Sequence, residues 1–169
     1  MNELHENEQY FFTNEFENDF VNLIVNHYSG SKICCVCCPM IGTRLADIGI
    51  NVTILDIDTR FSNYSQFKYY DITNPQYLDD EFDLIICDPP FFNVSFSKLN
   101  KALKSLTHYD TNVSIILTYL LRREAKFLTN LSEFGLHRMN IRPQYKTVDV
   151  TDPKRDIRLY SNTIIDMMI

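Results

Sequence analysis

The segment Asp88-Pro89-Pro90-Phe91 has the residue types best suited to a chemical reaction in this sequence. Its two prolines fix a stiff, extended turn and remove two backbone N–H donors. The Asp88 carboxyl and the Pro89 carbonyl are therefore two acceptors that we expect to face one point. A planar NH2 group could donate a hydrogen bond to each and turn its lone pair toward an electrophilic methyl group, while Phe91 stacks on its ring. These four residues are the predicted catalytic residues; the alternative is a rigid turn after a strand.

Three further acids follow strand-like segments and suit a nucleoside. Asp56 and Asp58 end the second predicted strand, where an acid of a Rossmann-like unit accepts hydrogen bonds from ribose hydroxyls. Both lie on one face of that strand, so periodicity does not separate them. Asp71 ends the third strand and could accept a hydrogen bond from an adenine amine. We expect Asp88 to contact the cofactor that carries this nucleoside.

The loop after the first predicted strand contains Cys38 and Pro39 but no GxGxG pattern. A nicotinamide dinucleotide needs close backbone approach to its pyrophosphate, which this loop offers poorly. S-adenosyl-L-methionine has no pyrophosphate, so the missing glycines exclude it less. Taken alone, this loop does not indicate a cofactor.

Four of the five cysteines crowd into the run Cys34-Cys35-Val36-Cys37-Cys38, which contains two overlapping CxxC spacings. This spacing is compatible with zinc, but side chains of a strand alternate between faces, and no second ligand pair follows at finger spacing. We therefore predict that these cysteines are small apolar core residues and that the protein binds no metal.

Short β-rich runs alternate with helical or turn segments along the chain. Strands are predicted at 32–38, 51–57, 67–71, 82–87, 113–118, 136–142 and 157–164, and helices at 14–28, 95–106 and 119–131. The run 82–87 is continuously apolar, as in a central parallel strand buried on both faces. The last two strands lack a helix between them, which indicates an antiparallel edge hairpin. The prediction is one α/β domain over 1–169, with 1–8 frayed, of the methyltransferase variant of the Rossmann-like fold: a mainly parallel sheet of about seven strands with helices on both faces.

Composition and charge narrow the classes of partner. The 169 residues are 45% apolar, as expected for a globular domain, and four glycines leave little room for a phosphate-binding loop. The net charge of −6 argues against a protein that grips nucleic acid through its whole surface, but it is compatible with a local basic patch. No apolar run reaches the roughly 18 residues of a membrane span. We expect no membrane contact and a cytoplasmic or nuclear location.

An ordered set of motifs resembles the eukaryotic N6-adenine methyltransferase-like family. These are Gln9-Tyr10-Phe11-Phe12-Thr13, Cys38-Pro39, the run Ile54–Phe61, the run Tyr69–Pro75 and Asp88-Pro89-Pro90-Phe91, and the resemblance covers residues 9–162. It implies an S-adenosyl-L-methionine-dependent N-methyltransferase in which Cys38 and Pro39 contact the cofactor. One branch methylates a lysine of translation elongation factor 1-alpha, and another methylates adenine N6 in ribosomal RNA. Gln9–Thr13 and Tyr69–Pro75 resemble the lysine branch, whereas Cys38-Pro39 and Asp156–Asn162 resemble the RNA branch.

Three functions follow from these observations. The first is methyl transfer to adenine N6 in RNA or DNA, with Lys154 and Arg155 near phosphates and Phe92 and Tyr10 at the substrate. This sequence lacks the zinc-finger modules of the RNA branch, so a partner protein would supply targeting. The second is lysine methylation of an elongation factor or similar protein, with Asp88 deprotonating the ammonium group. The third is a catalytically silent partner subunit.

Overall fold

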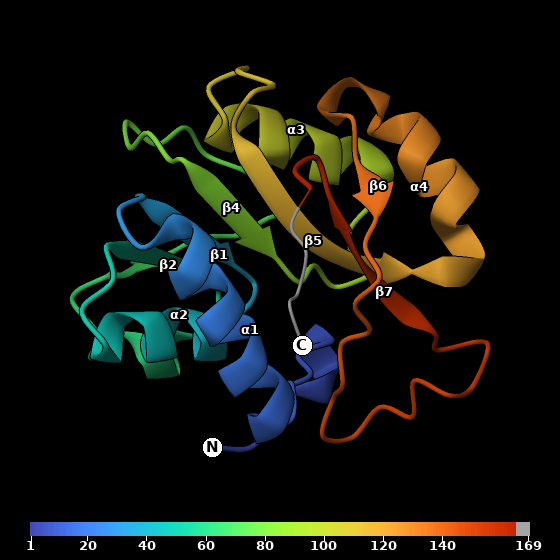
Figure 1. Ribbon diagram of the computed structural model, residues 1–169, viewed down its shortest axis with the longest axis horizontal. Helices are drawn as coiled ribbons and strands as arrows, with labels where there is room; N and C mark the ends of the chain where they lie inside the picture. Colours follow the sequence, from blue (N-terminus) through green and yellow to red (C-terminus); the bar gives the residue numbers. More distant parts are fainter. Residues whose placement is uncertain (165–169) are drawn as a thin grey trace.

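The computed structural model describes residues 1–164, which form a seven-stranded sheet with helices on both faces (Figure 1). The strand order is β3-β2-β1-β4-β5-β7-β6. The first five strands of this order are parallel, and β7 is antiparallel to both β5 and β6. The strands are β1 (Ile33–Val36), β2 (Val52–Asp56), β3 (Phe67–Tyr69), β4 (Leu84–Cys87), β5 (Ser114–Leu120), β6 (His137–Arg138) and β7 (Ile157–Ser161). The predicted fold class is confirmed, including its antiparallel edge hairpin.

Strands β1, β2 and β4 are buried along their whole length, as continuous apolar runs require when helices cover both faces of a sheet. Cys34 and Cys35 lie inside β1 with no exposed surface. Cys38 is also buried, and Cys37 is half-buried. The prediction that the cysteine run belongs to the core is confirmed for these positions.

Two pairs of helices cover the sheet. Helices α1 (Asn14–Tyr28) and α2 (Pro39–Asp47) lie on one face, and α3 (Phe96–Leu106) and α4 (Glu124–Asn130) lie on the other (Figure 1). Thr13 caps α1, since its hydroxyl accepts a hydrogen bond from the Phe16 N–H at 3.2 Å. Short 3-10 turns cover His5–Asn7, Thr59–Phe61, Leu121–Arg123 and Ser132–Phe134. None of the helices in residues 1–164 is long and apolar enough to cross a membrane.

Helix α2 was not predicted, because its first residues were interpreted as part of a cofactor loop. Pro39 occupies the first turn of α2, where the missing N–H costs nothing. Gly42 then lets the helix approach β2 closely, since a Cβ at this position would lie 2.7 Å from Ile54 Cγ1. The pattern Pro39…Gly42 therefore builds a helix packed tightly on the sheet.

The predictions differ from the structure near the end of the chain as well. Strand β5 continues through Tyr119 and Leu120, which are buried, so the predicted helix 119–131 begins only at Glu124. The predicted strand 136–142 is reduced to β6, because the chain leaves the sheet edge after Arg138. It then forms a long loop, 139–156, that returns along the N-terminal segment.

That loop and the N-terminal segment are joined by short antiparallel pairing. The Thr13 N–H donates to the Gln144 carbonyl at 2.8 Å, and the Lys146 N–H donates to the Phe11 carbonyl at 2.9 Å. This pairing sets Phe12 opposite Tyr145. Two segments far apart in sequence are thereby fixed together above the carboxyl ends of the strands.

Candidate active site

The carboxyl ends of β1, β2, β3 and β4 bring most of the predicted site residues together. Strand order reverses between β1 and β4, which is where ligands bind in open α/β sheets. One cavity at this edge is lined by Asp56, Asp71, Asp88 and Pro90, among others. A second, adjoining hollow is lined by Cys38, Pro39, Tyr10 and again Asp88. Asp88 thus lies where the two hollows meet.

Within residues 1–164, Asp88 is held by hydroxyl groups and pairs with no cation. Its Oδ1 accepts hydrogen bonds from the Thr118 hydroxyl and, at 2.8 Å, from the Tyr145 hydroxyl. Burial raises the pKa of Asp88 to about 7, although both hydroxyl hydrogen bonds act to lower it. In the described part of the chain, no donor lies within hydrogen-bond distance of Oδ2. The carboxyl therefore keeps one free acceptor and has a pKa near neutrality.

The rest of the Asp88-Pro89-Pro90-Phe91 turn is anchored on both sides. The Pro90 carbonyl accepts a hydrogen bond from the Val94 N–H at 3.2 Å, and the Phe91 carbonyl accepts one from Arg123 Nη1 at 2.8 Å. The Phe91 ring packs edge-on against Tyr119, with 5.5 Å between centroids. Within residues 1–164 the carbonyl of Pro89, the residue after Asp88, accepts no hydrogen bond, so it is a second acceptor without a donor.

The two acids of β2 differ in their surroundings. Asp56 lines the cavity, and burial raises its pKa to about 6 even though its Oδ1 accepts the Asp58 N–H at 2.8 Å. Asp58 instead pairs with Arg60 Nη2 at 2.6 Å and accepts a hydrogen bond from Gln9 at 2.9 Å. Burial would raise the pKa of Asp58, but these partners outweigh it and hold that pKa below its usual value. Asp56 is therefore the acid that lines the cavity and can still accept hydrogen bonds from a ligand.

Tyr70 and Asp71 also line this cavity. The Tyr70 hydroxyl is buried and has no hydrogen-bond partner within residues 1–164, which is costly unless a ligand supplies one. One Asp71 oxygen accepts the Thr73 N–H at 2.8 Å. An under-bonded carboxyl, an unpartnered hydroxyl and a second carboxyl fit the ribose hydroxyls and ring nitrogens of an adenosyl group.

The N-terminal segment lies across this cavity. Glu8, Gln9 and Tyr10 line it, and the Glu8 carboxylate accepts hydrogen bonds from the N–H groups of Phe92 and Asn93 at 3.1 and 2.9 Å. The enclosed space is about 70 Å³, well below the 300 Å³ or so of a small-ligand pocket. The segment makes more contacts than the expected fraying of residues 1–8 implies.

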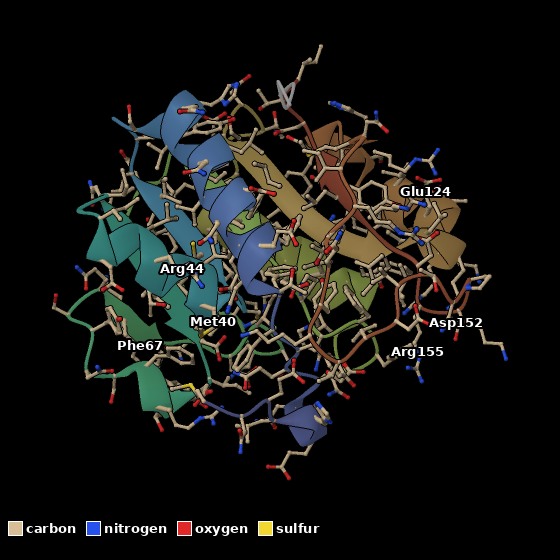
Figure 2. All side chains as sticks on the ribbon, turned by 60° about the horizontal axis from the view of Figure 1, so that its bottom comes forward. Met40, Arg44, Phe67, Glu124, Asp152 and Arg155 are labelled. Atoms are coloured by element: carbon tan, nitrogen blue, oxygen red, sulfur yellow. The ribbon has the colours of Figure 1, made fainter. Side chains whose placement is uncertain are left out.

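The predicted substrate residues separate into two groups. Tyr10 lies at the site, and Phe92 follows the catalytic turn with 65% of its surface exposed. Arg155 lies at the edge of the molecule, far from the cavity-lining Met40 (Figure 2). Arg155 is also within 4.0 Å of Asp152, whose side chain caps the Lys154 N–H. The structure does not bring Lys154 and Arg155 to Asp88.

The sequence did not point to four residues of the site, namely Thr118, Tyr145, Tyr70 and Arg122. Thr118 lies on the strand next to β4, so a search of every strand end would have found it. Tyr70 follows β3 in the same way. Tyr145 lies in a long loop, and no local signal in the sequence connects it with Asp88. The Arg122 guanidinium lies over the exposed Phe92 ring, 5.7 Å from its centroid.

Two other features of the molecule lie outside this site. A larger hollow of about 510 Å³, lined by Asp83, His108 and Val113 among others, lies at the opposite ends of β4 and β5. It contains none of the predicted site residues. Within residues 1–164, no group of three or more His, Cys, Asp or Glu side chains could hold a metal ion. Burial raises the pKa of the Cys34, Cys37, Cys38 and Cys87 thiols, so these groups stay neutral.

Comparisons with known proteins agree with this geometry. A family model described as "Probable N6-adenine methyltransferase" matches residues 3–164. No curated protein matches the chain. Magnesium protoporphyrin IX methyltransferase from Synechocystis PCC 6803, solved with bound S-adenosylmethionine, has 16% identity and a TM-score of 0.57 over 87% of this chain and 77% of that chain.

Two further solved structures share the fold at low identity. An S-adenosylmethionine-dependent methyltransferase from Clostridium acetobutylicum has 10% identity and a TM-score of 0.62 over 87% of this chain and 89% of that chain. The N-methyltransferase NodS from Bradyrhizobium japonicum has 13% identity and a TM-score of 0.55 over 88% of this chain and 96% of that chain.

Proposed function

The chain belongs to the N6-adenine methyltransferase family of S-adenosylmethionine-dependent enzymes, and we propose that it methylates the N6 amine of an adenine in RNA or DNA. One observation carries this proposal. Asp88 Oδ2 and the Pro89 carbonyl are adjacent acceptors without a protein donor in residues 1–164. They match the two N–H donors of a planar exocyclic amine.

Methyl transfer to such an amine requires its lone pair and the loss of one proton. S-adenosylmethionine supplies, when bound, a methyl group activated by a positively charged sulfur. Asp88 Oδ2 and the Pro89 carbonyl hold the two amine hydrogens, which turns the nitrogen lone pair out of conjugation with the ring. With a pKa of about 7, the ionised Asp88 carboxyl can also take the proton that the amine loses. Asp56, Tyr70 and Asp71 are the residues that would hold the adenosyl group.

The surface beside the catalytic turn supports a nucleic-acid substrate. Phe92 is exposed and stacked with Arg122, and no ion pair of the described residues involves Arg122. An exposed aromatic ring offers a stacking surface for a base, and an unpaired guanidinium suits a phosphate. This pair takes the role that the sequence suggested for Lys154 and Arg155. A base inside a duplex would have to be flipped out to reach Asp88.

Transfer of labelled methyl groups tests the proposal directly. Purified protein is incubated with labelled S-adenosylmethionine and, separately, with total RNA, genomic DNA and elongation factor 1-alpha. We expect label at N6 of adenine in one of the two nucleic acids. In Asp88→Ala, turnover should fall at least about a hundredfold, the scale for loss of one preorganised polar group, while binding of the demethylated cofactor persists. Full activity in Asp88→Ala would overturn the assignment of the site.

Asp88→Asn separates adenine from lysine as the target. An amide keeps an acceptor oxygen but loses the charge, so a neutral adenine amine should still be methylated at a measurable rate. A lysine ammonium needs the carboxylate to bind and deprotonate it, and activity on it should nearly disappear. Label on the elongation factor alone would replace adenine with lysine in the proposal. Absence of both label and cofactor binding would leave the silent-subunit hypothesis.

Arg122→Ala and Arg155→Ala form a matched pair for the binding surface. If Arg122 neutralises a phosphate, its removal should weaken RNA binding and lower the slope of log affinity against log salt by about one. Arg155→Ala removes the same charge at a distant edge and should change neither by a comparable amount. Equal effects of the two substitutions would show that only overall charge matters.

A further inference from the structure

Two hydroxyl groups from separate elements converge on one oxygen of Asp88. Thr118 lies on β5, the strand beside β4, and Tyr145 lies in the loop 139–156. Both hydroxyls donate to Oδ1, at 2.8 Å in the case of Tyr145. A carboxylate oxygen with two strong donors has little capacity for a third. The other oxygen, Oδ2, lacks a donor in the described part of the chain.

We propose that Tyr145 and Thr118 are positioning residues, which fix the plane of the Asp88 carboxyl so that Oδ2 alone faces the target amine. The role rests on the function proposed above, in which Asp88 accepts the amine hydrogen. A free aspartate rotates about its terminal torsion and offers both oxygens. Two donors on one oxygen stop that rotation and leave a single, oriented acceptor.

The choice of hydroxyls matters because no cation of the described residues faces Asp88. The titratable groups around it are Tyr145, Asp56 and the thiols of Cys37, Cys38 and Cys87. An arginine in place of the hydroxyls would bind both oxygens at once and stabilise the charge strongly. Hydroxyl donors orient the carboxylate but stabilise its charge less than an arginine would. The carboxylate therefore stays a good acceptor and can take up a proton.

Tyr145 is itself placed by the backbone pairing with the N-terminal segment. Its ring packs on Phe12 with 4.7 Å between centroids, and hydrogen bonds of 2.8 and 2.9 Å flank the pair. The hydroxyl therefore reaches Asp88 from a fixed position. Replacing Tyr145 with Phe removes one oxygen and keeps this packing, so the variant should fold.

Kinetics of Tyr145→Phe and Thr118→Val provide the first test. Each substitution should lower kcat roughly tenfold, the effect of losing one hydrogen bond to a charged group, with little change in KM for either substrate. The acidic limb of the pH–rate profile should also move up by about one unit, because the ionised carboxyl loses a donor. Tyr160→Phe is the matched control: Tyr160 is buried and bonds to Glu124 at 3.1 Å, away from the site. It should leave kcat and the pH profile unchanged.

A second readout does not depend on activity. In protein with ¹³C-labelled aspartate carboxyls, the Asp88 signal, assigned by its loss in Asp88→Asn, should titrate near pH 7. In Tyr145→Phe and Thr118→Val its midpoint should rise by about one unit, and in Tyr160→Phe it should not move. Unchanged midpoints and unchanged kcat would overturn the positioning role. Shifted midpoints in a protein that methylates no adenine would retain the carboxyl geometry and reject the proposed function instead.

Discussion

Two carboxyl groups in this molecule have opposite kinds of partner. Glu17, in α1, has 0% of its surface exposed and pairs with Arg44 Nε of α2 at 2.7 Å. Figure 2 shows Arg44 on α2, beside α1. Asp88 is half-buried, only hydroxyls of the described residues donate to its side chain, and its pKa is raised to about 7. The first group joins two helices, and the second lies at the edge of a cavity.

The difference shows how burial can be used for structure or for chemistry. A guanidinium beside Glu17 compensates the cost of removing a charge from water. Asp88 and Asp56 lack such a partner, so burial raises the pKa of each and leaves the carboxyl in need of a donor. A ligand with hydroxyl or amine hydrogens meets that need. Perturbed carboxyls without a cation are therefore the better guide to the site than burial alone.

Arg44→Leu tests the structural half of this comparison and should have the largest effect. It leaves Glu17 buried without its cation, and unfolding in urea should show a loss of about 3 kcal/mol, the low end for a broken buried pair because Arg44 is partly exposed. Affinity for the demethylated cofactor should not change. Arg44→Lys should restore part of the stability, and adding Glu17→Gln to Arg44→Leu should restore most of it. A loss below about 0.5 kcal/mol would mean that the pair is no more than a surface salt bridge.

Much of the cofactor half of the fold could be predicted from the sequence, because its signals are local. Strand-like runs predicted β1, β2 and β4, and the acids after two of them pointed to Asp88 and to the pair Asp56 and Asp58. A capping residue at Thr13 or Asn14 predicted the start of α1, and in the structure Thr13 is the cap. Each of these inferences needs only neighbouring residues and the rule that ligands gather at strand ends.

The rest of the site depends on contacts that local sequence patterns do not encode. Tyr145 reaches Asp88 only because residues 144–146 pair with residues 11–13, more than 130 positions away. Asp56 and Asp58 share a strand face, and they are distinguished only because Asp58 forms an ion pair with Arg60 and accepts a hydrogen bond from Gln9. Charge in the sequence pointed to Lys154 and Arg155, but nearby Asp152 engages that turn.

Asp56→Ala and Asp58→Ala test the functional half of the comparison, in which a carboxyl without a cation serves ligand binding. The measurement is cofactor affinity. Asp56→Ala removes the carboxyl that lines the cavity, so calorimetry should show roughly tenfold weaker binding of S-adenosylhomocysteine. Asp58→Ala disturbs only the Arg60 and Gln9 contacts and should weaken binding less.

The pH dependence of binding sharpens the same test. Asp56, with a pKa of about 6, is a better acceptor for ribose hydroxyls when ionised, so affinity should rise as pH increases through 6. This rise should disappear in Asp56→Ala and remain in Asp58→Ala. A larger loss in Asp58→Ala would exchange the roles of the two acids.

Asp88→Asn and Glu17→Gln compare the two carboxyl groups in a single measurement of stability. The folded-state pKa of Asp88, about 7, lies above the unfolded value of about 3.9, so ionisation of Asp88 destabilises the fold increasingly from pH 4 to pH 7. An amide keeps an oxygen for Thr118 and Tyr145 and removes the charge. Asp88→Asn should therefore stabilise the protein by about 1 kcal/mol at pH 8, well below the full linkage value because its NH2 group needs an acceptor, and by less at pH 5.

Glu17→Gln should destabilise the protein at both pH values, because it removes the partner of Arg44. The measurement is urea unfolding of wild type and both variants at pH 5 and pH 8. If Asp88→Asn also destabilised the protein at pH 8, the Asp88 charge would be compensated in the fold, and its contrast with Glu17 would be lost.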